Sequence, residues 1–230
     1  MVNGSHNDRY KDIQWFGKPY GEITVIGAGG IGSNVAFQLG RLGFTFTIFD
    51  NDTVEAANMS QLFDYGQVGI PKVIAINDTI QKFNPNCKVL SVNEMWSTEQ
   101  GTTEIIFSCV DNMKTRKDLF NAWISQLDTS NNNSVFIDAR LNSEDFRIFV
   151  INGLNYVQID EYNNKWLFSD EQASEPLCTN KSTPHVGTIC GSLMVSLFTN
   201  WLCRNDSLMR LLPFRIEVHI PTMTMNNEYI

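Results

Sequence analysis

The feature that most constrains the fold of this chain is a glycine-rich turn over residues 27–32. The turn follows a short apolar run, ITVI, and precedes a segment from Ser33 to Leu42 whose apolar residues recur at helical spacing. Gly43 ends this helix, and the run FTFTIFD then forms a second buried strand that ends at Asp50. A strand, a helix and a strand joined in this way predict parallel strands with a right-handed crossover.

Later segments extend this unit into a larger α/β domain. Apolar residues at helical spacing predict helices over residues 72–83 and 114–126 and after His185, and apolar or alternating runs predict the strands KVLSVNE, TEIIFSCVD, VFIDARL, FRIFVIN and FRIEVHI. We expect a Rossmann-like, doubly wound, mostly parallel sheet whose late strands run antiparallel. Residues 1–21 should form an N-terminal arm, residues 22–220 one domain with a crossover loop at 160–184, and residues 221–230 a tail.

Composition excludes several classes of function. The 230 residues suffice for one domain with a proper core, and a formal charge of -8 argues against general binding to nucleic acid or to anionic membranes. The N-terminus has no apolar signal-type region, and the apolar stretch at 187–198 is too short to span a bilayer, so we expect a soluble, cytoplasmic protein. Five scattered cysteines without a C-x-x-C pair fit a reducing compartment, and no zinc site is expected.

The turn itself predicts a nucleotide site. Gly27, Gly29 and Gly32 stand in G-x-G-x-x-G spacing, in which the first glycine permits the tight turn, the second admits phosphate to the main chain and the third lets helix and strand pack closely. Phosphate would lie at the helix N-terminus. Asp50, at the end of the second strand, is placed to accept hydrogen bonds from ribose hydroxyls. These residues suit NAD and ATP equally.

Two further motifs separate these nucleotides. The segments FDNDTVEAANMSQLF…VGIPKV and SCVDNMKTR resemble the signature of the ThiF/MoeB/HesA superfamily, the ubiquitin-activating-enzyme-like adenylyltransferases. The resemblance covers roughly the first two thirds of the chain. It implies that the protein uses ATP and Mg²⁺ to adenylate the C-terminal carboxylate of a small ubiquitin-like or sulfur-carrier protein ending in Gly-Gly, and that it forms a homodimer.

The resemblance also implies roles for single residues. Nucleotide binding would fall to Gly27, Gly29, Gly30, Gly32, Asp50, Asp52, Asn58, Gln61 and Lys72, with Lys72 at the α-phosphate and Asp111 on Mg²⁺. Two anions must meet in this reaction, so cationic and metal charge is needed at the phosphates. A solvated lysine in the first turn of a helix would oppose the helix dipole, which favours the phosphate role of Lys72. Asp111 could instead cap the following helix, and Asn58 could be a turn former.

One position departs from the family pattern. An arginine commonly follows the asparagine at this spacing, and Gln61 stands there instead, which removes a bidentate cation. Another basic residue could replace it: Arg41, Arg116, or Arg9 if the N-terminal arm reaches across a dimer. Otherwise turnover is slow or lost.

Cys178 is a candidate nucleophile. The segment LCTNKSTPHVGTICGSLMVSLFTNWL resembles the cysteine-containing crossover of the family, and a thiol near ATP could attack an acyl-adenylate if its pKa were lowered. Some relatives only adenylate, and then Cys178 would be an ordinary loop thiol. Cys109, Cys190 and Cys203 lie in apolar runs and should be small core residues.

Two alternative functions stay open. An NAD-dependent oxidoreductase would need an acid–base residue beside the nicotinamide, and the histidines, His6, His185 and His219, lie in no convincing setting for it. A non-catalytic subunit that binds a carrier without adenylating it would accommodate Gln61.

Overall fold

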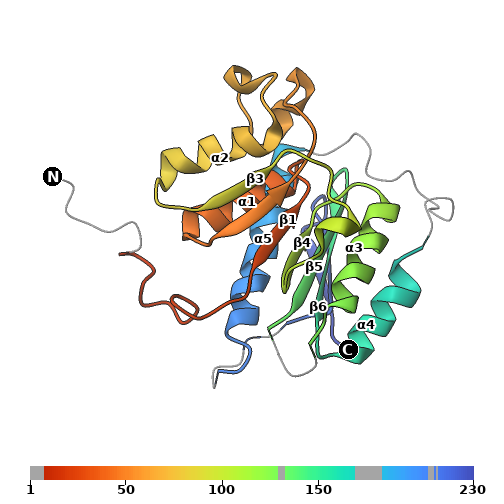
Figure 1. Cartoon of the computed structure of the whole chain (residues 1–230). Coiled ribbons are helices and arrows are strands. Elements are labelled where there is room, and N and C mark those ends of the chain that lie inside the picture. Colours follow the sequence, from red (N-terminus) through yellow and green to blue (C-terminus); the bar gives the residue numbers. More distant parts are fainter. Residues whose placement is uncertain (1–7, 129–132, 169–182, 207–209, 211) are drawn as a thin grey trace.

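The computed structural model describes residues 8–128, 133–168, 183–206, 210 and 212–230 (Figure 1). Within them lies one eight-stranded sheet with the order β3-β2-β1-β4-β5-β6-β7-β8. Its strands are β1 (Ile23–Ile26), β2 (Phe46–Phe49), β3 (Val89–Val92), β4 (Ile105–Ser108), β5 (Val135–Asn142), β6 (Asp145–Asn152), β7 (Arg215–His219) and β8 (Thr224–Glu228). The first five strands in this order, β3, β2, β1, β4 and β5, run parallel to one another. Strands β5, β6, β7 and β8 pair antiparallel, each with the next. The predicted doubly wound fold with antiparallel late strands is confirmed.

Helices cover both faces of this sheet (Figure 1). They are α1 (Gly32–Leu42), α2 (Lys72–Phe83), α3 (Met113–Ser125), α4 (Tyr156–Glu161) and α5 (Pro184–Leu202), with short 3₁₀ turns η1 (Ala56–Ser60), η2 (Tyr65–Gln67) and η3 (Thr98–Gln100) and a π-helical turn η4 (Tyr162–Trp166). The apolar residues of α1, α2 and α5 form one core cluster with the sheet, and those of α3 and η4 form a second. Each cluster removes apolar side chains from water on one side of the sheet, which fixes both helix layers.

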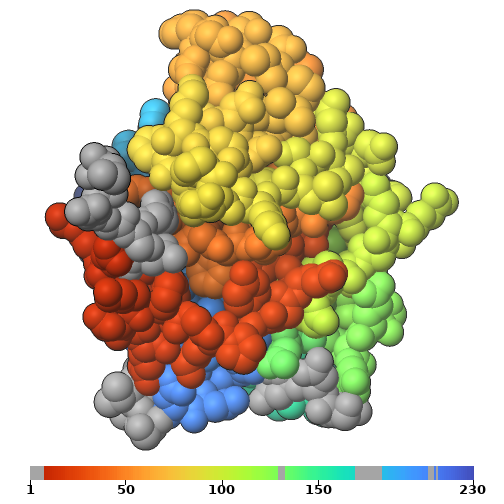
Figure 2. Space-filling model, turned by 60° about the vertical axis from the view of Figure 1, so that its left-hand side comes forward, coloured from red at the N-terminus to blue at the C-terminus, as the bar shows by residue number. Residues whose placement is uncertain are grey.

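The segment before β1 packs on the domain rather than extending from it. Trp15 is buried against Phe44, and Tyr10 stacks on Trp15. Lys18 pairs with Asp206 beyond the end of α5. Figure 2 shows these N-terminal residues, in red, spread over the surface beside the blue residues of α5.

Two expectations about the later chain were wrong. Residues 224–228 form β8, paired along its length with β7, rather than part of a tail. The predicted crossover loop does not begin at 160, because α4 and η4 continue the helix to Trp166, where they bury Tyr162 in the second core cluster. Among the described residues, no helix combines the length and apolar character needed to cross a membrane.

Candidate nucleotide site

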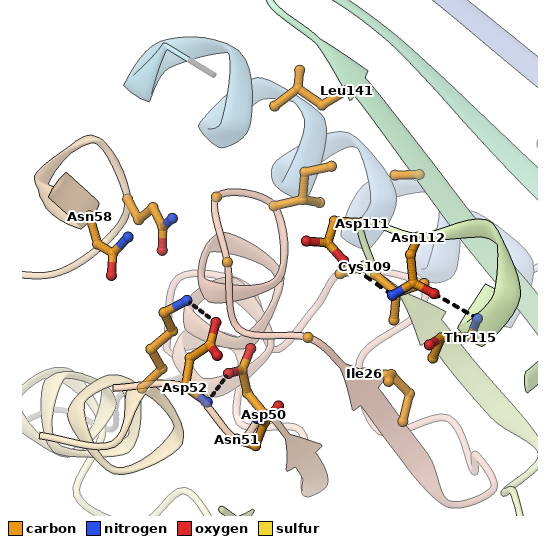
Figure 3. Close-up of a pocket in the computed structure, with 18 of the residues that line it drawn as sticks. Ile26, Asp50, Asn51, Asp52, Asn58, Cys109, Asp111, Asn112, Thr115 and Leu141 are labelled. Atoms are coloured by element: carbon orange, nitrogen blue, oxygen red, sulfur yellow. Dashed lines mark hydrogen bonds and ion pairs between the residues drawn. The ribbon is translucent and has the colours of Figure 1, made fainter. Parts of the chain in front are cut away.

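A polar cavity of about 570 Å³ lies at the carboxyl ends of β1, β2, β4 and β5 (Figure 3). Open α/β sheets place their ligands at this edge. The cavity is lined by Ile26, Gly27, Gly29, Gly30, Ile31, Asp50, Asn51, Asp52, Ala57, Asn58, Ser60, Gln61, Lys72, Met95, Trp96, Cys109, Val110, Asp111, Asn112, Thr115, Ala139, Arg140 and Leu141. The fold therefore gathers most of the predicted site residues around one space.

The three glycines of the glycine-rich turn differ in the space around them. Gly27 takes a left-handed φ of 93°, and a Cβ there would lie 2.6 Å from the carbonyl oxygen of Cys109. A Cβ on Gly32 would collide with the carbonyl oxygen of Gly27. Gly27 and Gly29 both line the cavity, but a Cβ on Gly29 would meet no atom within 4 Å. Gly27 and Gly32 thus allow close packing, while Gly29 leaves the cavity open beside helix α1. This helix begins without a side-chain cap.

Asp50 is fixed by the backbone around it. Its Oδ2 accepts a hydrogen bond from the Ala28 amide at 2.6 Å, and its Oδ1 accepts one from the Asp52 amide at 2.8 Å. Burial of the carboxyl group raises the pKa of Asp50 above its ordinary value, although these two hydrogen bonds and the Lys72 charge act in the opposite direction. The strand ends just before Asp50, as predicted, and the carboxylate lines the cavity where a ribose would be held.

Lys72 begins helix α2, and its ammonium pairs with Asp52 at 2.8 Å. The lysine side chain is 8% exposed, whereas that of Asp52 is 60% exposed. Both residues line the cavity (Figure 3). The ammonium is therefore not a solvated surface charge, and its partner is a carboxylate that can turn to solvent when a phosphate approaches.

Asn58 lies within the short turn η1, and Gln61 follows the turn directly. The Asn58 Oδ1 accepts a hydrogen bond from the Glu55 amide at 2.9 Å, so this side chain forms a turn and lines the cavity at once. The Gln61 Oε1 is buried and has no hydrogen-bond partner among the described residues. A buried acceptor without a partner is costly, which marks position 61 as incomplete until a ligand or another group donates to it.

Asp111 follows β4 and points into the cavity (Figure 3). The alternative that Asp111 caps helix α3 is wrong, because the neighbouring Asn112 accepts from the Thr115 amide at 2.8 Å and is the capping residue. The Asp111 Oδ1 accepts a hydrogen bond from the Asn112 Nδ2 at 3.3 Å. No cluster of three metal-binding side chains occurs in the described residues, but Mg²⁺ commonly uses one or two carboxylates together with phosphate oxygens, and Asp111 fits that donor set.

The cysteines differ in their settings. Cys190 and Cys203 are buried core residues, as predicted, whereas Cys109 is partly exposed and lines the cavity. Burial, reinforced by the nearby Asp138 charge, raises the pKa of the Cys109 thiol far above its usual range, which disfavours a reactive thiolate. The nucleophile candidate Cys178 lies outside the described residues.

A buried ionic cluster lies beside the cavity, and sequence reasoning missed it. Asp138 on β5 is fully buried and is held by Arg116 at 2.7 Å and by Arg140 at 3.1 Å. Ser108 and Tyr162 donate hydrogen bonds to the same carboxylate. Burial disfavours the charged carboxylate, but the two arginines outweigh it and hold the pKa of Asp138 below its ordinary value.

The structure bears on which basic residue could replace the arginine that is missing at position 61. Arg116 is 2% exposed and engaged with Asp138, and Arg41 stacks on Phe37 and Phe83; neither lines the cavity. The cross-dimer role of Arg9 stays a prediction. Arg140, which was not among the candidates, does line the cavity.

The sequence pattern of the ThiF family matches residues 20–228. The chain belongs to the ThiF family. It is 36% identical over 113 residues to ubiquitin-like modifier-activating enzyme 5 of Aedes aegypti, a match that covers 41% of this chain and 28% of that protein. It is 31% identical over 108 residues to tRNA threonylcarbamoyladenosine dehydratase 2 of Saccharomyces cerevisiae, covering 42% and 24%. The chain thus spans about a quarter of the length of these relatives.

Solved structures share the ThiF fold. The crystal structure of PaaA superposes with a TM-score of 0.69 at 18% identity, over 91% of this chain and 64% of that one. Escherichia coli MccB, crystallised with ATP, superposes with a TM-score of 0.67 at 17% identity, over 97% of this chain and 65% of that one. Other MccB structures contain its partner MccA.

Proposed function

We propose that the protein adenylates the C-terminal carboxylate of a small ubiquitin-like or sulfur-carrier protein that ends in Gly-Gly. A carboxylate oxygen attacks the α-phosphorus of ATP, a P–O bond to pyrophosphate breaks, and the product is an acyl-adenylate. The observation that carries this proposal is the single cavity that brings together the open glycine turn, Asp50, the buried Lys72 and Asp111. Family membership and the ATP complex of MccB support adenylation chemistry in general.

Each of these residues has a physical role in the proposed reaction. Asp50 accepts hydrogen bonds from ribose hydroxyls, and Gly29 admits the phosphates to the backbone of the turn. Lys72 exchanges its contact with Asp52 for the α-phosphate and neutralises charge that builds up in the transition state. Asp111 would hold Mg²⁺, which would supply positive charge at the phosphates. In this division, Asp50 and the glycine turn bind the nucleotide, and Lys72 and Asp111 stabilise the charge that develops at the phosphates.

The proposed acyl substrate follows from the relatives. Ubiquitin-like modifier-activating enzyme 5 is named for activation of a ubiquitin-like modifier, and MccB was crystallised with MccA. Both names favour a protein or peptide substrate over a free small acid. We further propose a homodimer, in which Arg9 of one subunit approaches the partner's site; sedimentation equilibrium at two protein concentrations tests the dimer.

A covalent step at Cys178 belongs to the same proposal. In that step the Cys178 sulfur attacks the acyl carbon, a thioester forms and AMP leaves. The Cys178→Ala variant should still form the acyl-adenylate but should lose a carrier adduct that hydroxylamine releases. An adduct that persists in the variant, or is absent from the wild-type protein with its true carrier, overturns this step.

A specific observation favours a second candidate, a subunit that binds a carrier without adenylating it. The unpartnered Gln61 Oε1 stands where the family commonly has a cation. The NAD-dependent oxidoreductase loses support, because neither described histidine, His185 nor His219, lines the cavity.

Intact mass spectrometry separates these functions. Wild-type protein, Mg²⁺ and ATP are incubated with candidate carriers ending in Gly-Gly, and a carrier species heavier by one adenylyl group is the expected product. Thermal shifts with ATP and with NAD, measured in parallel, report which nucleotide binds. Carrier binding without any adenylate favours the non-catalytic subunit, and stabilisation by NAD alone contradicts the proposed function.

A further inference from the structure

Two cations line the cavity among its described residues, and they differ in their surroundings. Lys72 is paired with Asp52, on the segment that follows β2. Arg140 lies on β5, on the opposite flank of the glycine turn in the strand order β2-β1-β4-β5. The proposed function assigns Lys72 to a phosphate and gives Arg140 no role.

Among the residues that the structure describes, the ionic cluster around Asp138 carries more positive than negative charge. One carboxylate serves both Arg116 and Arg140, while Ser108 and Tyr162 add only neutral donors. Arg116 also donates to the backbone carbonyl of Val110 at 2.6 Å, so it is fully engaged inside the protein. The uncompensated positive charge of the cluster therefore belongs at Arg140, whose side chain is 13% exposed.

Arg140 is rigidly held and still has donors to offer. Its Nε donates to Asp138, and its guanidinium lies over the ring of Phe149, 4.8 Å from the centroid. Its Nη2 makes only a long contact of 3.4 Å with the Tyr162 hydroxyl, and its Nη1 makes no hydrogen bond to a described residue. A guanidinium that is fixed at Nε and has most of its terminal N–H groups unused is well suited to bind a carboxylate through two parallel hydrogen bonds.

The sheet order places Arg140 where the attacking group must enter. Asp50 follows β2, the glycine turn follows β1, Asp111 follows β4, and Arg140 lies on β5, so these residues line the cavity in that spatial order. In phosphoryl-type transfer, the attacking and leaving oxygens lie roughly in line on opposite sides of phosphorus. Lys72, Asn58 and Gln61 all belong to the β2 side, which leaves the β5 side for the incoming carboxylate.

We propose that Arg140 binds the C-terminal carboxylate of the acyl substrate and orients it for attack, with Asp138 and Tyr162 acting as positioning residues that hold the guanidinium. This inference rests on the proposed adenylation. It makes the free carboxylate, rather than the peptide sequence alone, the group that the β5 side of the cavity selects. The α-phosphate of ATP is the other anion that could occupy the same donors, and the experiment separates the two.

The test measures binding of two matched peptides by isothermal titration calorimetry. One synthetic peptide ends in Gly-Gly with a free carboxylate, and the other carries the same sequence as a C-terminal amide; ATP with Mg²⁺ is titrated separately. Wild-type protein should bind the acid at least about tenfold more tightly than the amide, because a charge-assisted bidentate contact is lost in the amide. The Arg140→Gln variant should lose this preference and keep its ATP affinity.

Two further variants control for structure. Arg147 lies directly opposite Arg140 in the β5–β6 ladder, is exposed, pairs with Glu217 and does not line the cavity. The Arg147→Gln variant should therefore bind both peptides as the wild-type protein does. Arg140→Lys keeps the positive charge but lacks the paired N–H donors of the guanidinium. It should therefore show part of the preference for the acid that Arg140→Gln loses. Thermal unfolding of each variant confirms that a folded protein was titrated.

Each outcome decides the proposal. A loss of ATP affinity in Arg140→Gln with an unchanged acid preference makes Arg140 a phosphate ligand and overturns the inference. A wild-type protein that binds acid and amide equally, or an acid preference that survives in Arg140→Gln, also overturns it. If the preference behaves as expected but no carrier is ever adenylated, the proposed function fails while the carboxylate site stands.

Discussion

Asp50 is a partly buried carboxylate and Asp138 a fully buried one at the same edge of the sheet, and their charges are stabilised in different ways. Asp138 is fully buried between two arginines, which hold its pKa below the ordinary value despite burial. Asp50 has two backbone donors and no cation in contact, and burial raises its pKa. The charge of Asp138 is neutralised by arginines within the protein. The carboxylate of Asp50 can still accept hydrogen bonds, and ribose hydroxyls could donate them. The Asp138 cluster therefore stabilises the fold, whereas Asp50 has a binding role under the proposed function.

The largest expected effect on the free energy of unfolding comes from removing the Asp138 charge from its cluster with Arg116 and Arg140. Asp138→Asn leaves two buried guanidinium groups without a carboxylate, and the loss of one partner from a buried ion pair costs about 3–5 kcal/mol of unfolding free energy. Urea denaturation of variant and wild type measures it. The matched control is Asp52→Asn, which breaks the Lys72 pair at a largely exposed carboxylate and should cost clearly less than Asp138→Asn. Equal losses in the two variants would erase the distinction between the regions.

A smaller effect, on binding rather than on folding, is expected at Asp50. In Asp50→Asn, removal of an uncompensated buried charge offsets the lost acceptor, so stability should change by less than about 1 kcal/mol. The affinity for AMP should fall roughly tenfold, because a charge-assisted bond to the ribose is lost. Calorimetric titration with AMP measures this change. Unchanged affinity would remove Asp50 from the nucleotide site.

The smallest effect is the pH dependence, where the two carboxylates should differ in sign. Asp138, with its lowered pKa, adds stability that is fully present above its unfolded value of 3.8 and is lost as the pH falls below that value through the folded pKa. Asp50, with its raised pKa, is favoured in the protonated form, so stability falls as the pH rises above 3.8 through its folded pKa.

Urea unfolding of wild type, Asp50→Asn and Asp138→Asn between about pH 3 and about pH 7 resolves the two contributions. The Asp138→Asn difference from wild type should shrink toward acid. Asp50→Asn should gain on the wild type as the pH rises. The same direction of change in both comparisons would show that one of the assigned pKa shifts is wrong.

The sequence predicts the β2 region well because its signals are local. The glycine spacing, the strand ending at Asp50 and the helix opening at Lys72 each depend on neighbouring residues, and the structure has all three. The strand β8 was missed because its sequence, TMNNE, has neither alternation nor β-branched density. It is held to β7 by backbone pairing and by the ion pair between Glu228 and Arg215.

The Asp138 cluster depends on partners far apart in the chain. Asp138 meets Arg116 from α3, Ser108 from β4 and Tyr162 from η4, and no local pattern predicts that meeting. One signal was present in the strand VFIDARL: Asp138 and Arg140 stand two residues apart, and so face the same side of a strand whose other residues are mostly apolar. A charged pair on a buried strand face indicates an ionic cluster even when its other members cannot be named.

The most direct test of the proposed chemistry is pyrophosphate exchange into ATP, measured in wild type and Lys72→Ala with Mg²⁺ and a carrier whose C-terminal carboxylate is free. Asp50 and the glycine turn remain in the variant, so ATP affinity should fall by less than about tenfold. The exchange rate should fall by roughly a hundredfold or more, because the charge at the attacked phosphate is lost. Exchange at the wild-type rate in Lys72→Ala would contradict the role of the cavity as an adenylation site built around that lysine.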